Sequence, residues 1–275
     1  MIQSGGPGGD PDRPAARGET AASTETAEAP ADQGARRANI GNIQPTSNAG
    51  RRDASAVECR EPSQPWRLAF DGVTVDYGRS RVLSRVSFTC RPGSLTGIFG
   101  ANGAGKTTLL RLASGRARPS RGRVVYGDGG LTEAMRGRIG WLGHDPGLYP
   151  ELTAAENLRF FAALHGVADP DARVGEALDR ARLSDRAGDP VGSFSRGMRQ
   201  RIGLERALIA APRVVLLDEP FTGLDEVSSQ LLLARLAALR DGGAIVLLST
   251  HDPARIEALL DAAIVLRGGR LVAHV

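Results

Sequence analysis

One short segment constrains the fold of this chain more than any other. An apolar run at 95–99 leads into Gly100-Ala-Asn-Gly-Ala-Gly-Lys-Thr107, and a helical pattern follows from Thr108 to Ala113. Glycines at this spacing let the backbone turn successive N–H groups inward. A loop of this kind between a strand and a helix binds phosphate at the amino end of the helix. The segment therefore predicts an α/β nucleotide-binding core of the P-loop type.

The phosphate-binding candidates share one location, the loop and the first helical turn, and they are Gly100, Asn102, Gly103, Ala104, Gly105, Lys106, Thr107 and Thr108. Lys106 is the only lysine among 35 basic side chains. A compact ammonium fits between two phosphates where the planar fork of arginine is too bulky. The Thr107 hydroxyl is a ligand for Mg²⁺. A chance glycine-rich turn is the alternative, but strand, spacing, lysine and threonine together argue against it.

Two further apolar runs end in residues suited to hydrolysis. Residues 214–217 lead into Asp218 and Glu219, and residues 244–248 lead toward His251. Parallel α/β sheets bind ligands at the carboxyl ends of their strands. We expect Asp218 to hold Mg²⁺, Glu219 to orient and deprotonate the attacking water, and His251 to contact the γ-phosphate. The alternatives are a solvated acidic turn and a packing or surface histidine.

Hydrophobic patterning divides the chain into two parts. Residues 1–65 contain four Ile, Val, Leu or Phe residues, too few for a core, and predict a disordered low-complexity tail. Residues 66–275 predict one domain. Its beginning alternates as antiparallel strands do, at 66–77, 86–88 and 124–126. Its end alternates apolar strands (139–142, 214–217, 244–248, 264–266) with helices (199–209, 227–240, 253–260), which predicts a parallel sheet covered on both faces. A helical insert is expected at about 150–200.

Composition excludes several other classes of protein. No apolar run approaches the roughly 18 residues of a membrane-spanning helix, so the chain is not expected to cross a membrane by itself. Cys59 and Cys90 are too few for a disulfide scaffold and fit a reducing compartment. The net charge of +4 is small for 275 residues and gives little reason to expect a nucleic-acid partner.

Together with these motifs, residues 194–200, Phe-Ser-Arg-Gly-Met-Arg-Gln, resemble the signature loop of ABC transporter nucleotide-binding subunits. The resemblance extends over residues 66–275. It implies an ABC ATPase core with an antiparallel β subdomain and a small helical subdomain. It also implies ATP and Mg²⁺ as ligands, a head-to-tail homodimer with two ATP molecules between its subunits, and membrane permease partners. Such a subunit lies peripherally on the cytoplasmic face of the inner membrane.

The resemblance assigns roles to four more positions. Ser195 and Gly197 would face the γ-phosphate bound by the other subunit, where the start of a helix forms a second anion site. Asp225, in Gly223-Leu-Asp225, corresponds to the D-loop. Tyr77 corresponds to the aromatic residue that stacks on adenine, although an aromatic in an alternating strand is equally typical of a core.

Three positions depart from the family pattern. Arg196 replaces a glycine and Met198 a glutamine of the usual signature loop. His144 stands where most relatives have a glutamine that touches Mg²⁺ and water, and imidazole is a poor ligand for Mg²⁺. We therefore expect His144 to contact water or to couple the site mechanically to the permease. The sequence around it, Gly143-His-Asp-Pro-Gly147 followed by 152–158, resembles the haem exporter ATPase of cytochrome c maturation.

The predicted function is that of an ATP-hydrolysing subunit of a membrane ABC transporter, with haem export or handling as the expected task. The alternatives are another exporter, for drugs, lipids, polysaccharides or ions, and a soluble ABC ATPase acting on ribosomes or DNA. The soluble class usually has tandem cassettes or a long coiled coil between its motifs. Here one cassette and a short insert between His144 and Ser195 favour transport. A P-loop kinase would have no use for the signature loop.

Overall fold

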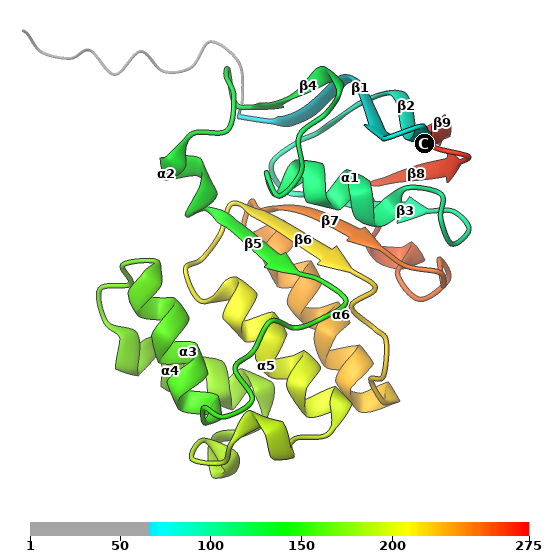
Figure 1. Ribbon diagram of the computed structural model, residues 1–275. Helices are drawn as coiled ribbons and strands as arrows, with labels where there is room; N and C mark the ends of the chain where they lie inside the picture. Colours follow the sequence, from blue (N-terminus) through cyan, green and yellow to red (C-terminus); the bar gives the residue numbers. More distant parts are fainter. Residues whose placement is uncertain (1–65, 275) are drawn as a thin grey trace, which may run out of the picture. The chain divides into compact units, whose positions relative to one another are not determined.

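A computed structural model describes residues 66–274 of the protein. The tail predicted at 1–65, Cys59 and Val275 lie outside the described residues. The described residues form two β-sheets and a set of helices that pack on them (Figure 1).

The smaller sheet contains three antiparallel strands, β1 (Leu68–Tyr77), β2 (Ser80–Cys90) and β4 (Arg121–Tyr126), in the order β2-β1-β4. Leu68 and Phe70 in the first half of β1, and Val73 and Val75 in the second half, are buried as the sequence pattern predicts, and a register shift separates the two halves. The tight turn between β1 and β2 contains Gly78, whose φ of 60° favours glycine. The antiparallel subdomain expected at the start of the domain is thus present.

The larger sheet contains six strands in the order β5-β6-β7-β3-β8-β9. Their bounds are β5 (Ile139–Leu142), β6 (Val214–Asp218), β7 (Ile245–Ser249), β3 (Ser94–Phe99), β8 (Ala262–Arg267) and β9 (Arg270–His274). The first five are parallel, and β9 pairs antiparallel with β8. Every residue of β6 and β7 is buried, which explains why these strands are continuous apolar runs rather than alternating ones.

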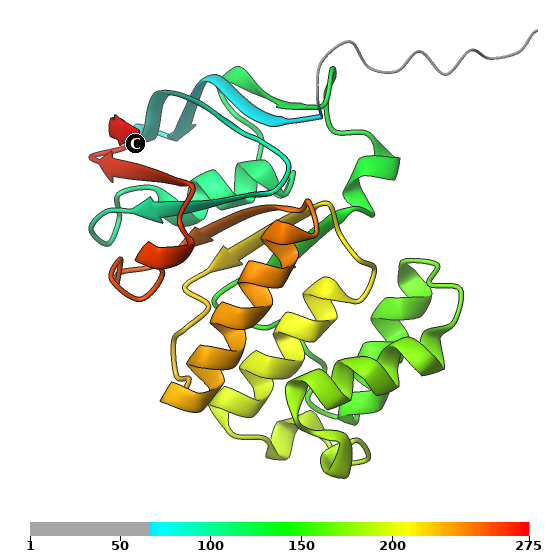
Figure 2. The ribbon, with the colours of Figure 1, turned by 180° about the vertical axis from the view of Figure 1, so that it is seen from behind.

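Helices cover both faces of the larger sheet (Figure 2). On one face, α1 (Lys106–Ala113) packs against strand side chains that include Leu216 and Leu247. On the other face, α5 (Arg196–Leu208) and α6 (Glu226–Asp241) pack with Leu217 and Leu248. Successive residues of each strand therefore belong to different cores.

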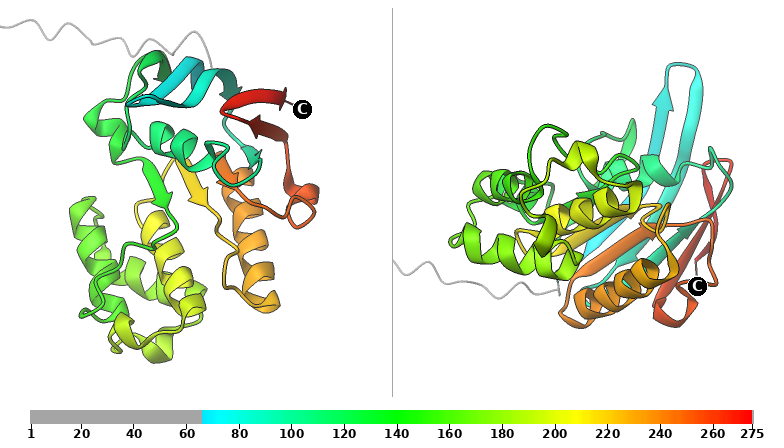
Figure 3. Two further views of the ribbon diagram at one scale, coloured as in Figure 1. Left: turned by 45° about the vertical axis from the view of Figure 1, so that its right-hand side comes forward. Right: turned by 90° about the horizontal axis from the view of Figure 1, so that it is seen from below.

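A third core lies in the cluster of helices that separates β5 from β6 in the sequence. Figure 3 shows this cluster in two further views. It contains α3 (Ala154–Leu164), α4 (Pro170–Ala181) and the short 3₁₀ helices η1 (Ser184–Arg186) and η2 (Val191–Ser193), together with part of α5. Thr153 begins α3 with a capping box, because its hydroxyl accepts the Glu156 N–H while the Glu156 carboxylate accepts the Thr153 N–H. Within residues 66–274, the helices are too short or too polar to span a bilayer.

One predicted helix is wrong, and two elements were not predicted. Residues 253–260 contain only the 3₁₀ helix η3 (Glu257–Leu259). Tertiary contacts hold this segment as turns, since Ile256 is fully buried and Asp261 accepts the Leu95 N–H at 2.8 Å. The strand β9 and the four-residue helix α2 (Glu133–Arg136) lack a strong apolar period, so the sequence pattern did not reveal them.

Candidate nucleotide-binding site

Four predicted site segments meet at one edge of the larger sheet. The phosphate loop follows β3, Asp218 ends β6, His251 follows β7, and His144 follows β5. These four strands are parallel, so their carboxyl ends lie at the same edge. Long-range pairing of the sheet thus assembles residues that are more than 100 positions apart.

The phosphate loop is held in a conformation that requires glycine. Gly100 has a φ of 146° and Gly105 a φ of 105°, and a Cβ at Gly100 would lie 2.4 Å from the Leu266 carbonyl oxygen. Gly105 is the N-cap residue of α1 and carries no side chain that could bond the first N–H groups of the helix. Those N–H groups and the positive end of the helix are consequently available to an anion.

Lys106 is 7% exposed and is tied to the loop that it follows. Its Nζ donates hydrogen bonds to the carbonyl oxygens of Gly100, at 2.8 Å, and Ala101, at 3.4 Å. The same nitrogen lies 3.9 Å from the Glu219 carboxylate. A bulkier guanidinium would have to displace the loop carbonyls, which supports the steric reason for a lysine here.

Asp218 and Glu219 are linked by a serine that sequence reasoning did not assign. The fully buried Ser249 hydroxyl donates to Asp218 Oδ1 at 2.6 Å and accepts the Glu219 N–H at 3.0 Å. Glu219 also has a φ of 52°, an uncommon value for a residue with a side chain. The signal that could have identified Ser249 is its position at the end of β7, next to the strand that ends in Asp218.

The structure brings His251 to Glu219. Its Nδ1 lies 2.9 Å from Glu219 Oε2, with Nδ1–H as the donor in the tautomer that bonds a carboxylate. The histidine side chain is 75% exposed and that of Glu219 is 21% exposed. The packing alternative for His251 is therefore excluded, and Lys106, Glu219 and His251 form one chain of contacts.

The remaining loop residues differ in burial. Asn102 and Gly103 are exposed, Ala104 is buried, and Thr107 and Thr108 are half-buried in the first turn of α1. Asp218 is 4% exposed. A threonine hydroxyl and a carboxylate are the hard oxygen donors that Mg²⁺ accepts, and Mg²⁺ commonly keeps only one or two protein ligands beside water and phosphate. Thr107 and Asp218 therefore fit the ion that the sequence predicts.

Two candidates lie outside this network. Tyr77, at the end of β1, is 53% exposed, which excludes the alternative that it belongs to the core. His144 is exposed in the loop after β5 and forms no hydrogen bond or ion pair within residues 66–274. The structure thus leaves both side chains accessible to a ligand or a partner.

The signature segment and the 223–225 loop lie side by side. Ser195 is the N-cap of α5, and its hydroxyl accepts the Met198 N–H at 3.3 Å. A Cβ at Gly197 would lie 3.2 Å from the Gly223 carbonyl oxygen, and the Arg196 side chain covers Gly223. Asp225 caps α6 by accepting the Ser228 N–H at 2.7 Å, and this bond lowers the Asp225 pKa. Arg196, the departure from the usual signature, therefore packs on the neighbouring loop.

The parallel sheet, the phosphate loop and the two acids define the class of this protein, a P-loop nucleotide-binding ATPase. The ABC transporter family model matches residues 83–222. The chain is 39% identical over 194 residues to the ABC transporter ATP-binding protein NatA of Bacillus subtilis, covering 68% of this chain and 78% of that protein. It is 37% identical over 212 residues to the Nod factor export ATP-binding protein I of Ralstonia nicotianae, covering 75% of this chain and 66% of that protein.

A solved structure titled as the ATP-binding subunit of an ABC transporter superposes with a TM-score of 0.71 at 32% identity, covering 76% of this chain and 89% of that one. The chain belongs to the ABC transporter ATP-binding family, and it is an ATPase subunit of a transporter. The predicted fold class is confirmed. Neither of the two named relatives is described as a haem exporter, so the comparisons lend the haem prediction no support.

Proposed function

We propose that this protein supplies ATP hydrolysis to a membrane exporter as a head-to-tail dimer. The observation that carries the proposal is the contrast between two anion sites. The phosphate loop has Lys106, Asp218 and Glu219 around it, whereas the start of α5 contacts only its own first turn and the neighbouring 223–225 loop and leaves Ser195 exposed. A second copy would present its bound ATP to Ser195 and Gly197, and Asp225 belongs to the adjoining loop.

The chemistry of each site follows from its contacts. The loop amides and Lys106 would hold the phosphates, and Tyr77 would stack on the adenine. Glu219 takes the proton of the attacking water, and the bond from His251 keeps its carboxylate oriented. Thr107 and Asp218 would hold Mg²⁺, which neutralises charge on the phosphates when bound. His251 also lies where it can donate to the γ-phosphate.

An exposed aromatic patch beside the His144 loop is the proposed permease contact. Tyr149, Phe160 and Leu164 are 46%, 44% and 68% exposed, and the rings of Tyr149 and Phe160 stand edge to face at 5.2 Å. Exposed apolar groups that gather in this way mark interaction surfaces. Because His144 and Tyr149 belong to the same loop, a permease segment docked on the patch would sense nucleotide state through that loop. The protein would then lie peripherally on the cytoplasmic face of the inner membrane.

The cargo is proposed by class only. One relative is named for Nod factor export, which favours an exporter of an organic molecule. Haem handling for cytochrome c maturation is the second candidate, favoured by the Gly143-His-Asp-Pro-Gly147 loop. A protein acting on ribosomes or DNA is not proposed, since the described part of the chain presents one cassette.

The permease contact is tested by co-purification with the membrane subunits of its transporter. We expect Phe160→Asp to release the permease while ATP binding is kept, because a charge on the patch opposes burial. Val272→Asp, at a comparably exposed apolar position on β9, is the matched control and should co-purify as the wild type does. Retention of the permease by Phe160→Asp would contradict the proposed docking surface.

The cargo is tested in a deletion strain. Loss of cytochrome c with normal resistance to drugs would favour haem handling, and the reverse pattern would favour drug export. Complementation by the wild-type gene, but not by Glu219→Gln, ties either phenotype to hydrolysis.

A further inference from the structure

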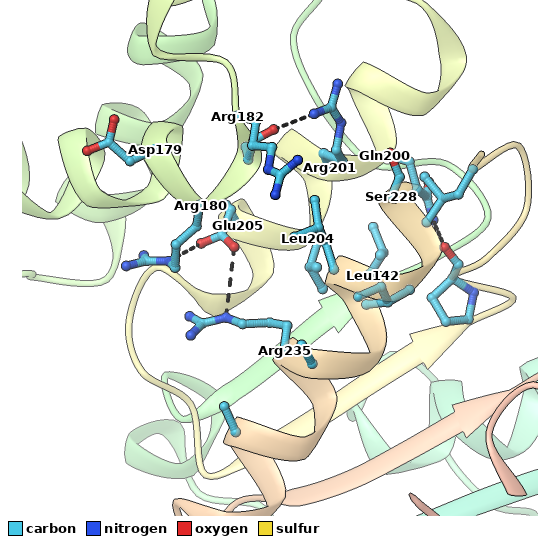
Figure 4. Close-up of a pocket in the computed structure, with 17 residues that line it drawn as sticks. Leu142, Asp179, Arg180, Arg182, Gln200, Arg201, Leu204, Glu205, Ser228 and Arg235 are labelled. Atoms are coloured by element: carbon cyan, nitrogen blue, oxygen red, sulfur yellow. Dashed lines mark hydrogen bonds and ion pairs between the residues drawn. The ribbon is translucent and has the colours of Figure 1, made fainter. Parts of the chain in front are cut away.

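A groove on the opposite side of α5 from the helical core has no role in the chemistry above. It lies between the end of α4, α5 and α6, and its volume is about 410 Å³ (Figure 4). Small-molecule pockets span roughly 300–1,000 Å³. Its lining includes no residue of the phosphate loop, so the groove is distinct from the nucleotide site.

The walls of the groove are mostly apolar. Leu142 comes from β5, Leu204 from α5, and Leu231 and Leu232 from α6, while Ala234 and Ala238 are exposed along one wall. Burying such surface contributes about 25 cal/mol per Å², so an alkyl or aromatic group would gain free energy by entering it.

Arginines outnumber carboxylates in the lining of the groove. Arg180 Nε donates to the buried Glu205 carboxylate at 2.9 Å, and Arg235 lies 3.9 Å from the other oxygen of that carboxylate. The Glu205 carboxylate thus faces two guanidinium groups, as Figure 4 shows, and Arg180 also pairs with Glu176, outside the lining, at 3.3 Å.

Two further arginines in the lining, Arg182 and Arg201, form no ion pair within residues 66–274, and the charge of Arg201 contributes to the lowered pKa of Asp225. Arg201 Nη1 donates to the Ala181 carbonyl oxygen at 2.6 Å. The exposed Arg182 side chain forms no hydrogen bond or ion pair. The only other acid in the lining, Asp179, already accepts the Ser184 hydroxyl. The excess positive charge therefore favours an anion.

We propose that this groove binds an amphipathic organic anion, a single short alkyl or aryl chain with one carboxylate or phosphate. The chain would lie on the leucines, and the anionic group would bond Arg182 and Arg201. The site is separate from the proposed transport function and is testable without nucleotide or permease.

Its position connects it to the catalytic segments. Gln200, in the lining, donates from Nε2 to the Pro220 carbonyl oxygen at 3.1 Å, and Pro220 directly follows Glu219. Leu224 and Ser228 of the lining flank Asp225. A ligand in the groove would touch both segments.

The test is calorimetric titration of the full chain, without nucleotide, with sodium decanoate. Decyltrimethylammonium has the same chain with a positive head, and butanoate has the head without the chain. We expect saturable binding of one decanoate per chain and much weaker binding of both controls. Arg182→Met should weaken decanoate binding about tenfold, because one charge-assisted hydrogen bond is lost. Ala234→Trp should fill the groove and abolish the saturable binding.

Arg123→Met, at an exposed position on β4, is the control substitution and should bind decanoate as the wild type does. Thermal melting of each variant verifies the fold. The proposal is overturned if decanoate does not bind saturably, if the cation binds equally well, or if Arg182→Met and Ala234→Trp both bind like the wild type.

Discussion

The phosphate-loop site and the proposed signature site are built in different ways. At the first, Lys106, Asp218 and Ser249 are each less than a tenth exposed, and hydrogen bonds join strands β3, β6 and β7. At the second, Ser195 and Asp225 are exposed N-caps whose side chains bond only their own helices. The first site is organised within one chain, whereas the proposed second site would present helix ends to another molecule. The difference predicts that substitutions at the first impair chemistry within a subunit and substitutions at the second impair it between subunits.

The largest effect is expected for Glu219→Gln, which removes the proposed base and keeps the shape of the side chain. Turnover should fall by about 10²–10⁴-fold, the usual contribution of a general base. ATP binding should persist, and the protein should accumulate as a dimer in gel filtration with ATP. Undiminished phosphate release by this variant would remove Glu219 from the role.

Lys106→Arg tests whether the first site depends on shape as well as charge. The guanidinium is too large for the space near the Gly100 and Ala101 carbonyls, so nucleotide affinity or turnover should fall about a hundredfold. Titration with a fluorescent nucleotide measures affinity and so separates a loss of binding from a loss of turnover. Activity close to that of the wild type would mean that the lysine is not required for steric reasons.

Mixing two inactive variants tests whether the second site acts across subunits. Ser195→Arg should bind ATP and fail to hydrolyse it. An equal mixture with Lys106→Arg should regain about a quarter of wild-type turnover, because half of the dimers then hold one intact composite site. A mixture no more active than its parts would contradict the head-to-tail arrangement.

Ser249→Ala tests whether the phosphate-loop site depends on the hydroxyl that links Asp218 to Glu219. A buried hydrogen-bonded group that loses its partner costs about 1–3 kcal/mol, so both the free energy of unfolding and turnover should decrease. We expect turnover to fall about tenfold, and urea denaturation gives the change in stability. Ser193→Ala, at an exposed serine of η2, serves as the control.

The smallest effect is expected at Asp225, which contributes to the second site as a cap. The Ser228 N–H lowers the pKa of its carboxyl below the ordinary value, so Asp225 stabilises the fold above that value and loses this contribution as the pH falls through the lowered pKa. Urea denaturation should show Asp225→Asn less stable than the wild type at pH 7, with the difference shrinking near pH 3. A stability difference between Asp225→Asn and the wild type that grows as the pH falls would contradict a lowered Asp225 pKa. Asp128→Asn, in an exposed turn, is the control.

Local patterns predicted the parts of the first site but not their connections. The phosphate loop and the pair Asp218-Glu219 are each contiguous, so spacing and flanking apolar runs indicate their chemistry. Ser249 bonds Glu219 and Asp218, which are 30 and 31 positions away, through a parallel pairing that no local pattern encodes. The helix predicted at 253–260 was wrong for the same reason, because the contacts of Ile256 and Asp261 override its helical period.

By itself, the sequence determined the P-loop class, the apolar strands and the identity of the residues that carry charge, since glycine freedom, hydrophobic period and side-chain type are properties of short segments. Tertiary structure alone decided that Lys106 bonds the loop carbonyls, that His251 reaches Glu219, that Tyr77 is exposed and that Arg196 covers Gly223. The arginine-lined groove also arises only when α4, α5 and α6 come together. The Lys106 bonds reach back only five and six residues, whereas the other features depend on the packing of distant segments, which the burial of apolar surface drives.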